Sequence, residues 1–364
     1  MSSKININNI EIKNNDIKNN DIKNSRMKND IETKSMKNKN DIEIKNNKTK
    51  NNIEIKNLTK KFGNFTAVDK MNLTIKEGEI FGFLGPNGAG KTTTISMLTT
   101  LIHPTSGTAV IAGHDLLTED VDIRSIIGVV PQSFSLFAEL TAQENLEYIG
   151  KLYGMSTNQI KERSEYLLKQ VSLYEHRDRI AGIFSGGMKQ RLSLAASIMS
   201  SPKILFMDEP TTGLDPQSRI AIRELTEQLN SEGITIIYTT HDMEEADKIC
   251  DRIVIMDQGK IIADGTSDQL KHLIMSGHLI EVRLSPEEKK DMHNIIPELK
   301  KLSFVKSVVY NKDVMHITVN TKAGTFYMIS DFFHKKNIVI EEIQYKEPSL
   351  EDVFIHLTKK DVRD

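Results

Sequence analysis

The stretch that decides the fold is Ile80-Phe-Gly-Phe-Leu-Gly-Pro-Asn-Gly-Ala-Gly-Lys-Thr92. Its first five residues form an almost wholly apolar run of strand length, and Thr93–Leu101 continues with a helical pattern. Between them, Gly85–Thr92 matches the pattern G-x-x-x-x-G-K-[ST] without exception. Glycines let the backbone wrap a phosphate, and N–H groups at a helix N-terminus point at its negative charge. The sequence therefore predicts a phosphate-binding loop, whereas the alternative is an ordinary glycine-rich turn.

Individual side chains of this loop have predicted tasks. Lys91 is expected to reach the terminal phosphates of a nucleotide, and the Thr92 hydroxyl is expected to bind magnesium. The remaining residues predicted to contact the nucleotide are Gly85, Pro86, Asn87, Gly88, Ala89, Gly90 and Thr93.

An acidic pair follows a second apolar strand. Ile204–Met207 leads directly into Asp208-Glu209-Pro210. Because α/β sheets place their ligands at the carboxyl ends of strands, both acids are candidates for the site. Asp208 is predicted to hold magnesium through water, and Glu209 to polarise the attacking water as a general base. The alternative is a pair of solvated acids that caps the next turn.

The middle of the chain, residues 53–265, alternates short β-rich runs with helical periods. This alternation predicts an α/β domain with a largely parallel sheet, interrupted by a helical subdomain at about residues 134–200. The predicted strands are Ile80–Leu84, Thr108–Ala112, Gly128–Val130, Ile204–Met207, Ile234–Thr239 and Arg252–Met256. The predicted helices of the subdomain are Leu140–Tyr153, Thr157–Val171 and Met188–Ser200.

The last hundred residues have a different pattern. Residues 278–346 have the order β-α-β-β-α-β, which predicts a small ferredoxin-like α+β domain, and residues 347–364 are predicted to form a C-terminal helix and tail. The signals are the strands Leu279–Leu284, Val305–Tyr310, Met315–Val319 and Ile338–Tyr345, the helix start at Ser285–Glu288, the turn Asn311–Asp313 and the helix Gly324–Lys336.

Residues 1–52 form a low-complexity segment. They contain 15 asparagines, and 12 Lys/Arg against 7 Asp/Glu give a local excess of 12 − 7 = +5. Isolated isoleucines among polar residues cannot offset the entropy of ordering, so we predict that the segment is disordered. Its role is open between a basic tether to lipid head groups and a neutral extension.

Bulk properties narrow the class of protein. A formal net charge of −2 over 364 residues gives no global argument for nucleic acid or an anionic membrane as partner. The sequence has neither an apolar run long enough to cross a bilayer nor an apolar N-terminal signal. A single cysteine, Cys250, fits a reducing compartment, so a cytoplasmic location is predicted.

A phosphate loop alone leaves GTPases, kinases, helicases and transport ATPases open. Four further features narrow the choice. Ser185-Gly-Gly-Met188 begins an alanine-rich helix, and Gln132 follows the predicted strand Gly128–Val130. Gly213-Leu-Asp215 comes after the acidic pair, and His241 comes after Ile234–Thr239.

With these motifs in this order, residues 53–265 resemble the ATP-binding-cassette (ABC) superfamily. The signature departs from the commonest form, since Phe184 and Met188 replace leucine and glutamine, while Ser185-Gly-Gly187 is kept. Motif by motif, Gly85–Thr92 is similar to the Walker A motif, Ile204–Glu209 to Walker B with its catalytic glutamate, Phe184–Met188 to the signature, Gln132 to the Q-loop, Leu214–Asp215 to the D-loop, His241 to the H-loop and Phe62 to the aromatic residue that stacks on adenine.

The resemblance implies a P-loop ABC ATPase with ATP and Mg²⁺ as cofactors. Two cassettes of a homodimer would sandwich two ATP molecules, with Ser185, Gly186 and Gly187 serving the nucleotide of the other subunit. It also implies that His241 contacts the γ-phosphate and that Gln132 senses magnesium. The groove of the helical subdomain would dock a membrane partner.

The C-terminal segment Pro348–Phe354 resembles that of ATPases from ABC-2 type exporters of the daunorubicin-resistance kind. This likeness implies an ATP-hydrolysing subunit at the cytoplasmic face of the membrane. It would drive a separately encoded ABC-2 permease, with drug or lipid-like export expected. The alternative is a non-transport ABC ATPase acting on ribosomes or DNA. Members of that kind usually carry two cassettes or an inserted coiled coil, whereas this sequence has one phosphate loop and no sustained heptads between Gln132 and Ser185.

Overall fold

A computed structural model describes residues 51–274, 278–285, 292–311, 314–320, 324–346 and 348–361. The predicted disordered tail therefore lies outside the described residues, except that its last two residues begin the first strand. Most of the helix start predicted at Ser285–Glu288 and of the turn predicted at Asn311–Asp313 also lies outside them, as do the last three residues of the predicted C-terminal tail.

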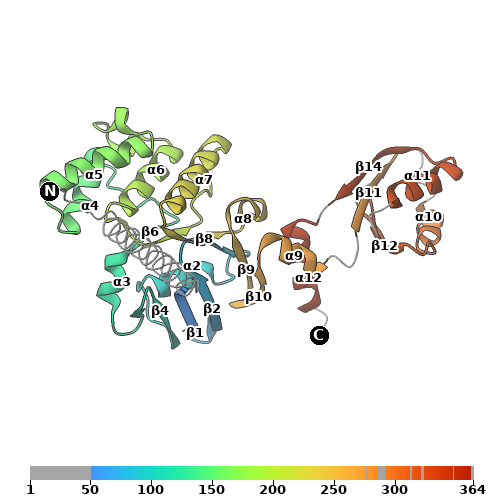
Figure 1. The fold of residues 1–364 in the computed structure, drawn as a ribbon, viewed down its shortest axis with the longest axis horizontal. Coiled ribbons are helices and arrows are strands. Elements are labelled where there is room, and N and C mark those ends of the chain that lie inside the picture. The colour runs from blue at the N-terminus through green and yellow to red at the C-terminus, as the bar shows by residue number, and fades with distance from the viewer. Residues whose placement is uncertain are drawn as a thin grey trace, which may run out of the picture. The chain divides into compact units, whose positions relative to one another are not determined.

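A six-stranded sheet forms the centre of the α/β domain (Figure 1). Its order is β10-β9-β3-β8-β7-β6; only β10 runs antiparallel to its neighbour, so the prediction of a largely parallel sheet is confirmed. The strands are β3 (Ile80–Leu84), β6 (Ile127–Val130), β7 (Ile204–Asp208), β8 (Thr235–Thr240), β9 (Arg252–Asp257) and β10 (Lys260–Gly265). β3, β7 and β8, which carry the phosphate loop, the acidic pair and His241, lie side by side, so their carboxyl ends meet at one edge.

The central strands are buried on both faces, as their near-continuous apolar sequences predict. In β3, Phe81 and Phe83 point into one hydrophobic cluster, while Ile80 and Leu84 point into another. Since successive side chains of a strand alternate between faces, a single five-residue strand contributes to two cores. Each fully buried apolar side chain contributes about 1.5–3 kcal/mol, so β3 is an anchor for the loop that follows it.

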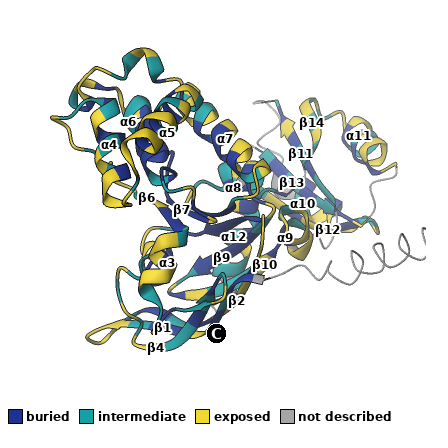
Figure 2. Cartoon of the chain, turned by 60° about the vertical axis from the view of Figure 1, so that its left-hand side comes forward, coloured by how far each residue is buried: buried dark blue, intermediate teal, exposed yellow. Residues whose placement is uncertain are grey.

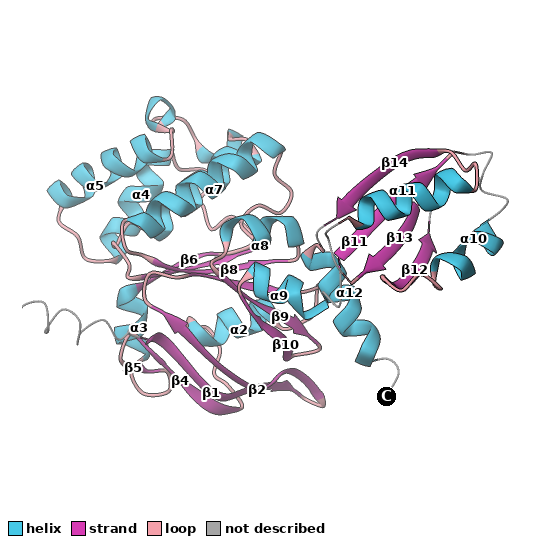
Figure 3. Ribbon diagram, turned by 45° about the vertical axis from the view of Figure 1, so that its right-hand side comes forward, coloured by secondary structure: helices cyan, strands magenta, loops and turns pink. Residues whose placement is uncertain are grey.

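One face of the central sheet is covered by a second, antiparallel sheet with order β2-β1-β4-β5 (Figure 3). Its strands are β1 (Asn51–Phe62), β2 (Phe65–Lys76), β4 (Ser106–Ile111) and β5 (His114–Asp115). The predicted strand Thr108–Ala112 corresponds to β4 and belongs to this sheet, because β4 pairs antiparallel with β1. The helix α2 (Lys91–Leu98) contributes Ile95, Met97 and Leu98 to the core on this face, and α3 (Asp120–Ile126) contributes Ile123.

Helices cover the other face. Figure 2 shows these helices coloured by burial, with both buried and exposed residues along them. Serine or threonine begins two of them: Thr141 with Glu144, and Ser156 with Gln159, form capping boxes that satisfy free N–H groups of the first turn. The helices are α4 (Ala142–Leu152), α5 (Thr157–Gln170), α6 (Gly186–Ser197), α7 (Pro216–Ser231) and α8 (Met243–Ile249), with the short 3₁₀ turns η1 (Tyr174–His176) and η2 (Ala181–Ile183).

The C-terminal region has a four-stranded antiparallel sheet with order β12-β13-β11-β14 and its own hydrophobic core. Together with the element order, this arrangement confirms the ferredoxin-like prediction. The elements are β11 (His278–Leu284), α10 (Met292–Leu299), β12 (Val305–Asn311), β13 (Val314–Val319), α11 (Thr325–Lys335) and β14 (Ile340–Lys346).

Two further helices join the cassette core. α9 (Ser267–Ile274) and α12 (Leu350–Asp361) pack against each other, and α12 also contacts α8. Leu350 and Val353 are buried in the same cluster as Ile249. Cys250, next in sequence to Ile249, is buried beside Gly82 of β3. Among the described residues, no helix has the length and apolar character needed to cross a bilayer.

Candidate active site

The loop between β3 and α2 is a tight cradle that only glycine can build. Gly88 and Gly90 have φ of +86° and +104°, in the region that side chains disfavour. A Cβ on Gly85 would lie 2.3 Å from the carbonyl oxygen of Met256, and one on Gly90 would lie 2.5 Å from that of Ala67. Because Gly90 also caps α2, the loop presents the free N–H groups of a helix N-terminus. This cradle fits a phosphate.

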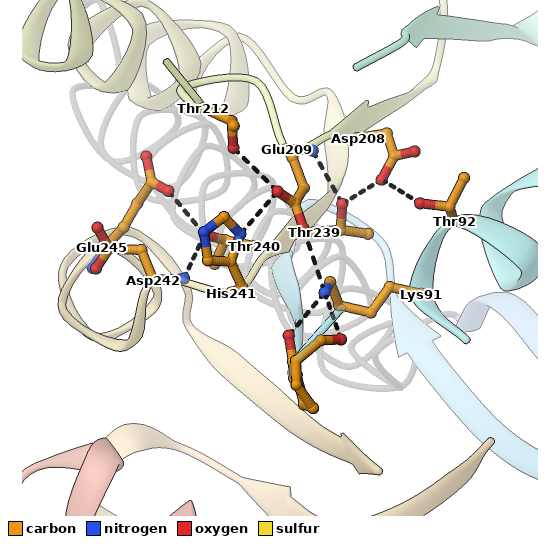
Figure 4. Close-up of polar contacts among 12 residues, drawn as sticks. Lys91, Thr92, Asp208, Glu209, Thr212, Thr239, Thr240, His241, Asp242 and Glu245 are labelled. Carbon is orange, nitrogen blue, oxygen red and sulfur yellow. Dashed lines mark hydrogen bonds and ion pairs between the residues drawn. The ribbon is translucent and has the colours of Figure 1, made fainter. Parts of the chain in front are cut away.

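Lys91, the first residue of α2, is buried although it carries a charge. Its Nζ donates to the carbonyl oxygens of Gly85 at 2.7 Å and Pro86 at 3.2 Å, and lies 3.2 Å from Oε1 of Glu209 (Figure 4). A buried ammonium needs such partners, since desolvation penalises an unpaired charge. Lys91 therefore lies between the phosphate loop and the end of β7, where its ammonium group could contact a phosphate oxygen.

Asp208 ends β7 and faces the phosphate loop. Thr92 Oγ1 donates to Asp208 Oδ1 at 3.2 Å, and Thr239 Oγ1 donates to the same oxygen at 2.6 Å. Hydroxyl and carboxylate oxygens are the ligands that Mg²⁺ prefers, so Thr92 and Asp208 fit a magnesium ion. Gln132 lies just beyond β6, the neighbour of β7, and is exposed; within the described residues no hydrogen bond joins it to this cluster.

Glu209 sits at a sharp turn of the backbone, with φ +48°. Its N–H lies 3.1 Å from the carbonyl oxygen and 3.0 Å from the hydroxyl of Thr239. Its Oε2 accepts from Thr212 Oγ1 at 2.9 Å and lies 2.7 Å from Nδ1 of His241. Burial raises the pKa of Glu209, but the Thr212 hydrogen bond, the charge of Lys91 and His241 outweigh it, so the net pKa lies below the ordinary glutamate value. The Glu209 carboxylate is thus ionised at neutral pH and held in one orientation by its partners.

His241 follows β8, and its neighbours on the chain fix it there. Because a carboxylate can only accept, the contact with Glu209 means that Nδ1 carries the proton. The next residue, Asp242, caps α8 by accepting from the N–H groups of Glu244 and Glu245. Glu245 in turn accepts from the hydroxyls of Tyr238 at 2.8 Å and Thr240 at 2.9 Å. The start of α8 is thereby bonded to β8 on both sides of the turn that bears His241.

The tip of α6 and the tip of α7 form a second polar centre. Ser185 caps α6 by accepting from the N–H of Met188, which explains why the helix begins two residues before the prediction. Asp215 caps α7 and takes hydrogen bonds from the N–H and the hydroxyl of Ser218, at 3.0 and 2.6 Å. Gly187 packs so closely here that a Cβ would lie 2.0 Å from Ser218 Oγ.

The two centres are separate in their bonding. No polar contact among the described residues links Ser185, Gly186 or Gly187 to the loop Gly85–Thr92 of the same chain. Lys91, Thr92, Asp208, Glu209 and His241 therefore form a group around Glu209, and the helix tips form a second group around Asp215. Among the described residues, Gln132 is bonded to neither group.

Phe62 ends β1 and pairs across the turn with Phe65, the first residue of β2. Both rings are mostly exposed, and the Lys60 ammonium lies 5.1 Å from the centroid of Phe62. A cavity of about 390 Å³ beside the phosphate loop is lined by Phe65 rather than Phe62, together with Thr66, the residues Pro86–Ala89, Asp257 and Gln258. Sequence reasoning missed Phe65; the signal that could have found it is its place opposite Phe62 across a two-residue hairpin turn.

Sequence reasoning also missed the hydroxyls of Thr212 and Thr239, which bond to Glu209 and to both acids respectively. Thr212 lies three residues after Glu209, within reach of a local side-chain hydrogen bond. Thr239 lies 31 residues after Asp208, and only the alignment of β7 with β8 brings the two together.

The chain is similar in sequence to known ATP-binding proteins. The sequence profile of the ABC transporter family matches residues 68–212. Over 311 residues the chain is 38% identical to the linearmycin resistance ATP-binding protein LnrL of Bacillus subtilis strain 168, covering 84% of this chain and 98% of that one. Over 302 residues it is 36% identical to the daunorubicin resistance ATP-binding protein DrrA2 of Streptomyces coeruleorubidus, covering 83% and 93%.

Solved structures are similar as well. One is the dimeric structure of a post-hydrolysis state of an ATP-binding cassette bound to ADP and Pi; it is 31% identical with a TM-score of 0.54, over 59% of this chain and 98% of that chain. Another, an ATP-binding subunit of an ABC transporter, is 29% identical with a TM-score of 0.56, over 61% and 92%.

Proposed function

Because the chain belongs to the ABC transporter family, we propose that it is the ATP-hydrolysing subunit of an exporter. It drives a separately encoded ABC-2 type permease, and its cargo is a drug or a lipid-like molecule. The observation that carries the proposal is the convergence of Lys91, Asp208, Glu209 and His241 at one sheet edge. The names of the relatives, which are resistance ATP-binding proteins, support the export of a drug-like cargo.

The residues around the phosphate loop divide the work of hydrolysis. The N–H groups of the loop and Lys91 would bind the phosphates of ATP, and Thr92 and Asp208, together with Gln132, would hold Mg²⁺. Bound Mg²⁺ would supply positive charge that offsets the charge of the phosphate oxygens. Glu209 accepts a proton from the attacking water, which its depressed pKa permits because the carboxylate stays ionised at neutral pH. His241 is hydrogen-bonded to Glu209 and would contact the γ-phosphate.

The group around Asp215 serves the nucleotide of a second copy. A serine hydroxyl and the free N–H groups at the start of α6 suit a γ-phosphate. Since this group makes no polar contact with the phosphate loop of its own chain, a complete site needs the loop of one copy and Ser185, Gly186 and Gly187 of the other. The similar dimeric cassette structure with ADP and Pi supports this homodimer.

Attachment to the membrane would come through the permease. A cavity of about 530 Å³ lies next to the helical subdomain, and its wall includes the exposed apolar residues Leu101, Leu152 and Tyr153. Exposed apolar surface of this kind marks sites where another protein binds. We assign it to the permease, which places the chain at the cytoplasmic face of the cell membrane.

Replacing the general base tests the ATPase assignment. Glu209→Gln keeps the shape of the side chain but cannot take a proton. The variant should bind ATP, lose turnover and accumulate a stable ATP-bound dimer, measured by phosphate release, nucleotide binding and size-exclusion chromatography. The matched control is Glu227→Gln, the same change at an exposed position of α7, which should hydrolyse ATP normally. Normal hydrolysis by Glu209→Gln would overturn the assignment of the base.

A further inference from the structure

Thr239 lies at the centre of the active-site edge. It is on β8, which runs between β3 and β7, and the strand register places it beside Phe83 on one side and Asp208 on the other. The residue is fully buried. A buried hydroxyl needs hydrogen-bond partners, and its partners here are the two acids of the site.

The hydroxyl of Thr239 both donates and accepts. It donates to Oδ1 of Asp208 at 2.6 Å and accepts from the N–H of Glu209 at 3.0 Å, as Figure 4 shows. A threonine hydroxyl has one hydrogen to donate, and here that hydrogen is directed to the carboxylate. Because a hydrogen bond to a charged acceptor is roughly twice as strong as a neutral one, it fixes which way the Asp208 carboxylate faces.

The second bond falls on a strained part of the backbone. Glu209 has φ +48°, which side-chain-bearing residues adopt only when their surroundings hold them there. Its N–H is held by two oxygens of Thr239, the hydroxyl and the main-chain carbonyl. This turn is also what directs the Glu209 side chain toward Lys91 and His241.

We propose that Thr239 is a positioning residue whose hydroxyl aligns both acids: it orients Asp208 as a magnesium ligand and anchors Glu209 as the base. This inference rests on the proposed ATPase function. It adds that the metal site and the general base are not set independently, because one side chain of a neighbouring strand holds both. Thr92 donates to the same oxygen of Asp208 from the opposite side, so Asp208 lies between the phosphate loop and β8.

The test removes the hydroxyl while keeping the shape of the side chain. Thr239→Val should lower ATP turnover, and should also raise the Mg²⁺ concentration needed for half-maximal binding of a fluorescent ATP analogue. Loss of a residue that orients a metal ligand typically costs 10–100-fold in affinity or activity, so about that range is expected. Thr239→Ser keeps the hydroxyl and should recover most of both quantities.

A matched control lies on the same strand. Thr235 is also fully buried, and its hydroxyl accepts from Nδ2 of Asn52 at 2.7 Å and from the N–H of Gly78 at 2.9 Å, at the opposite end of β8. Thr235→Val should lower the melting temperature but leave the Mg²⁺ dependence unchanged. If Thr239→Val does not fold, Thr239→Ala takes its place in the same comparison.

The outcomes separate this inference from the proposed function. If the unaltered chain shows no ATP hydrolysis, the proposed function fails. If it hydrolyses ATP and the folded Thr239→Val protein keeps its turnover and its Mg²⁺ dependence, only the inference fails. It also fails if Thr239→Ser loses as much as Thr239→Val, because the methyl packing and not the hydroxyl would then be responsible.

Discussion

Glu209 contacts residues from several separate motifs of the site. Its carboxylate contacts Lys91, Thr212 and His241, and its N–H is bound to Thr239. Hydrogen bonds and positive charge favour the ionised form, which is why its pKa is depressed despite burial. The carboxylate of Glu209 is therefore ionised at neutral pH.

The pH dependence of turnover follows from this balance. Glu209 can accept a proton only in its ionised form, so turnover should be lost as the pH falls through its depressed pKa. Thr212→Val removes the largest of the interactions that lower the pKa of Glu209, so the pKa rises and the acid limb of the kcat/KM profile should move to higher pH. Thr212→Ser keeps a hydroxyl and should leave the limb in place. An unchanged limb in Thr212→Val would show that this bond does not set the pKa.

Single residues could be predicted where a short contiguous motif specifies them. Lys91, Thr92 and Asp208 follow from contiguous motifs, because a phosphate loop and the end of a buried strand each specify their side chains within a few positions. Thr239 could not be predicted this way, since its partners depend on which strand lies beside β7. The aromatic wall of the cavity shows the same limit, because the sequence points to Phe62 and the structure places Phe65 there.

At the scale of elements, the start of α6 is closely packed against the start of α7. Gly187 meets the hydroxyl and Cβ of Ser218, which Asp215 holds in turn. The signature helix and the segment that bears Asp215 are therefore expected to move together as one piece. A displacement of one helix tip should move the other, because close-packed groups transmit strain to their neighbours.

This packing predicts an asymmetry between adjacent glycines. Gly187→Ala should destabilise the fold by about 1–3 kcal/mol, the typical cost of overpacking. Gly186→Ala should not, since its Cβ would make only an ordinary contact of 3.6 Å with Leu214. Adding Ser218→Gly to Gly187→Ala should recover part of the loss in a double-mutant cycle of chemical denaturation. Simple additivity of the two changes would contradict the contact.

Elements buried on both faces were the easiest to predict. β3 and β7 are apolar at nearly every position, and β8 has the apolar run Ile236–Tyr238 at its centre, so none of them shows the alternation of an amphipathic helix. The long β1–β2 hairpin was not resolved into strands by sequence, because polar residues interrupt it and register shifts break its alternation. The sequence also did not show to which sheet Thr108–Ala112 belongs, because its pairing with β1 joins residues that are far apart in the chain.

At the scale of the whole molecule, the chain returns to its cassette after the ferredoxin-like domain. α12 packs on α9 and α8, with Leu350 and Val353 in the main hydrophobic cluster. The β-α-β-β-α-β order could be predicted from local patterns. The packing of α12 on α8 and α9 could not, because the apolar stripe of a helix does not show which element it packs against. Since α12 contacts α8, and α8 begins just after His241, α12 supports an element that borders the candidate site.

Shortening a buried side chain of α12 tests that support. Leu350 is 1% exposed, so Leu350→Ala should lower the free energy of unfolding by about 2–5 kcal/mol. Ile355→Ala, on the same helix but 39% exposed, should change it by less than about 0.5 kcal/mol. Thermal and denaturant unfolding measure both, and equal effects of the two changes would mean that α12 does not bear on the cassette.

The burial of Cys250 has a practical consequence. It is the one cysteine of the 364 residues, it lies in the core beside Gly82, and burial raises the pKa of its thiol far above the ordinary value. Because thiol reagents attack the thiolate, maleimides should leave the native protein unmodified. A second cysteine introduced at an exposed position would then take a spin label or a fluorophore alone. The distance between labels on two copies would then measure the formation of the proposed homodimer in real time.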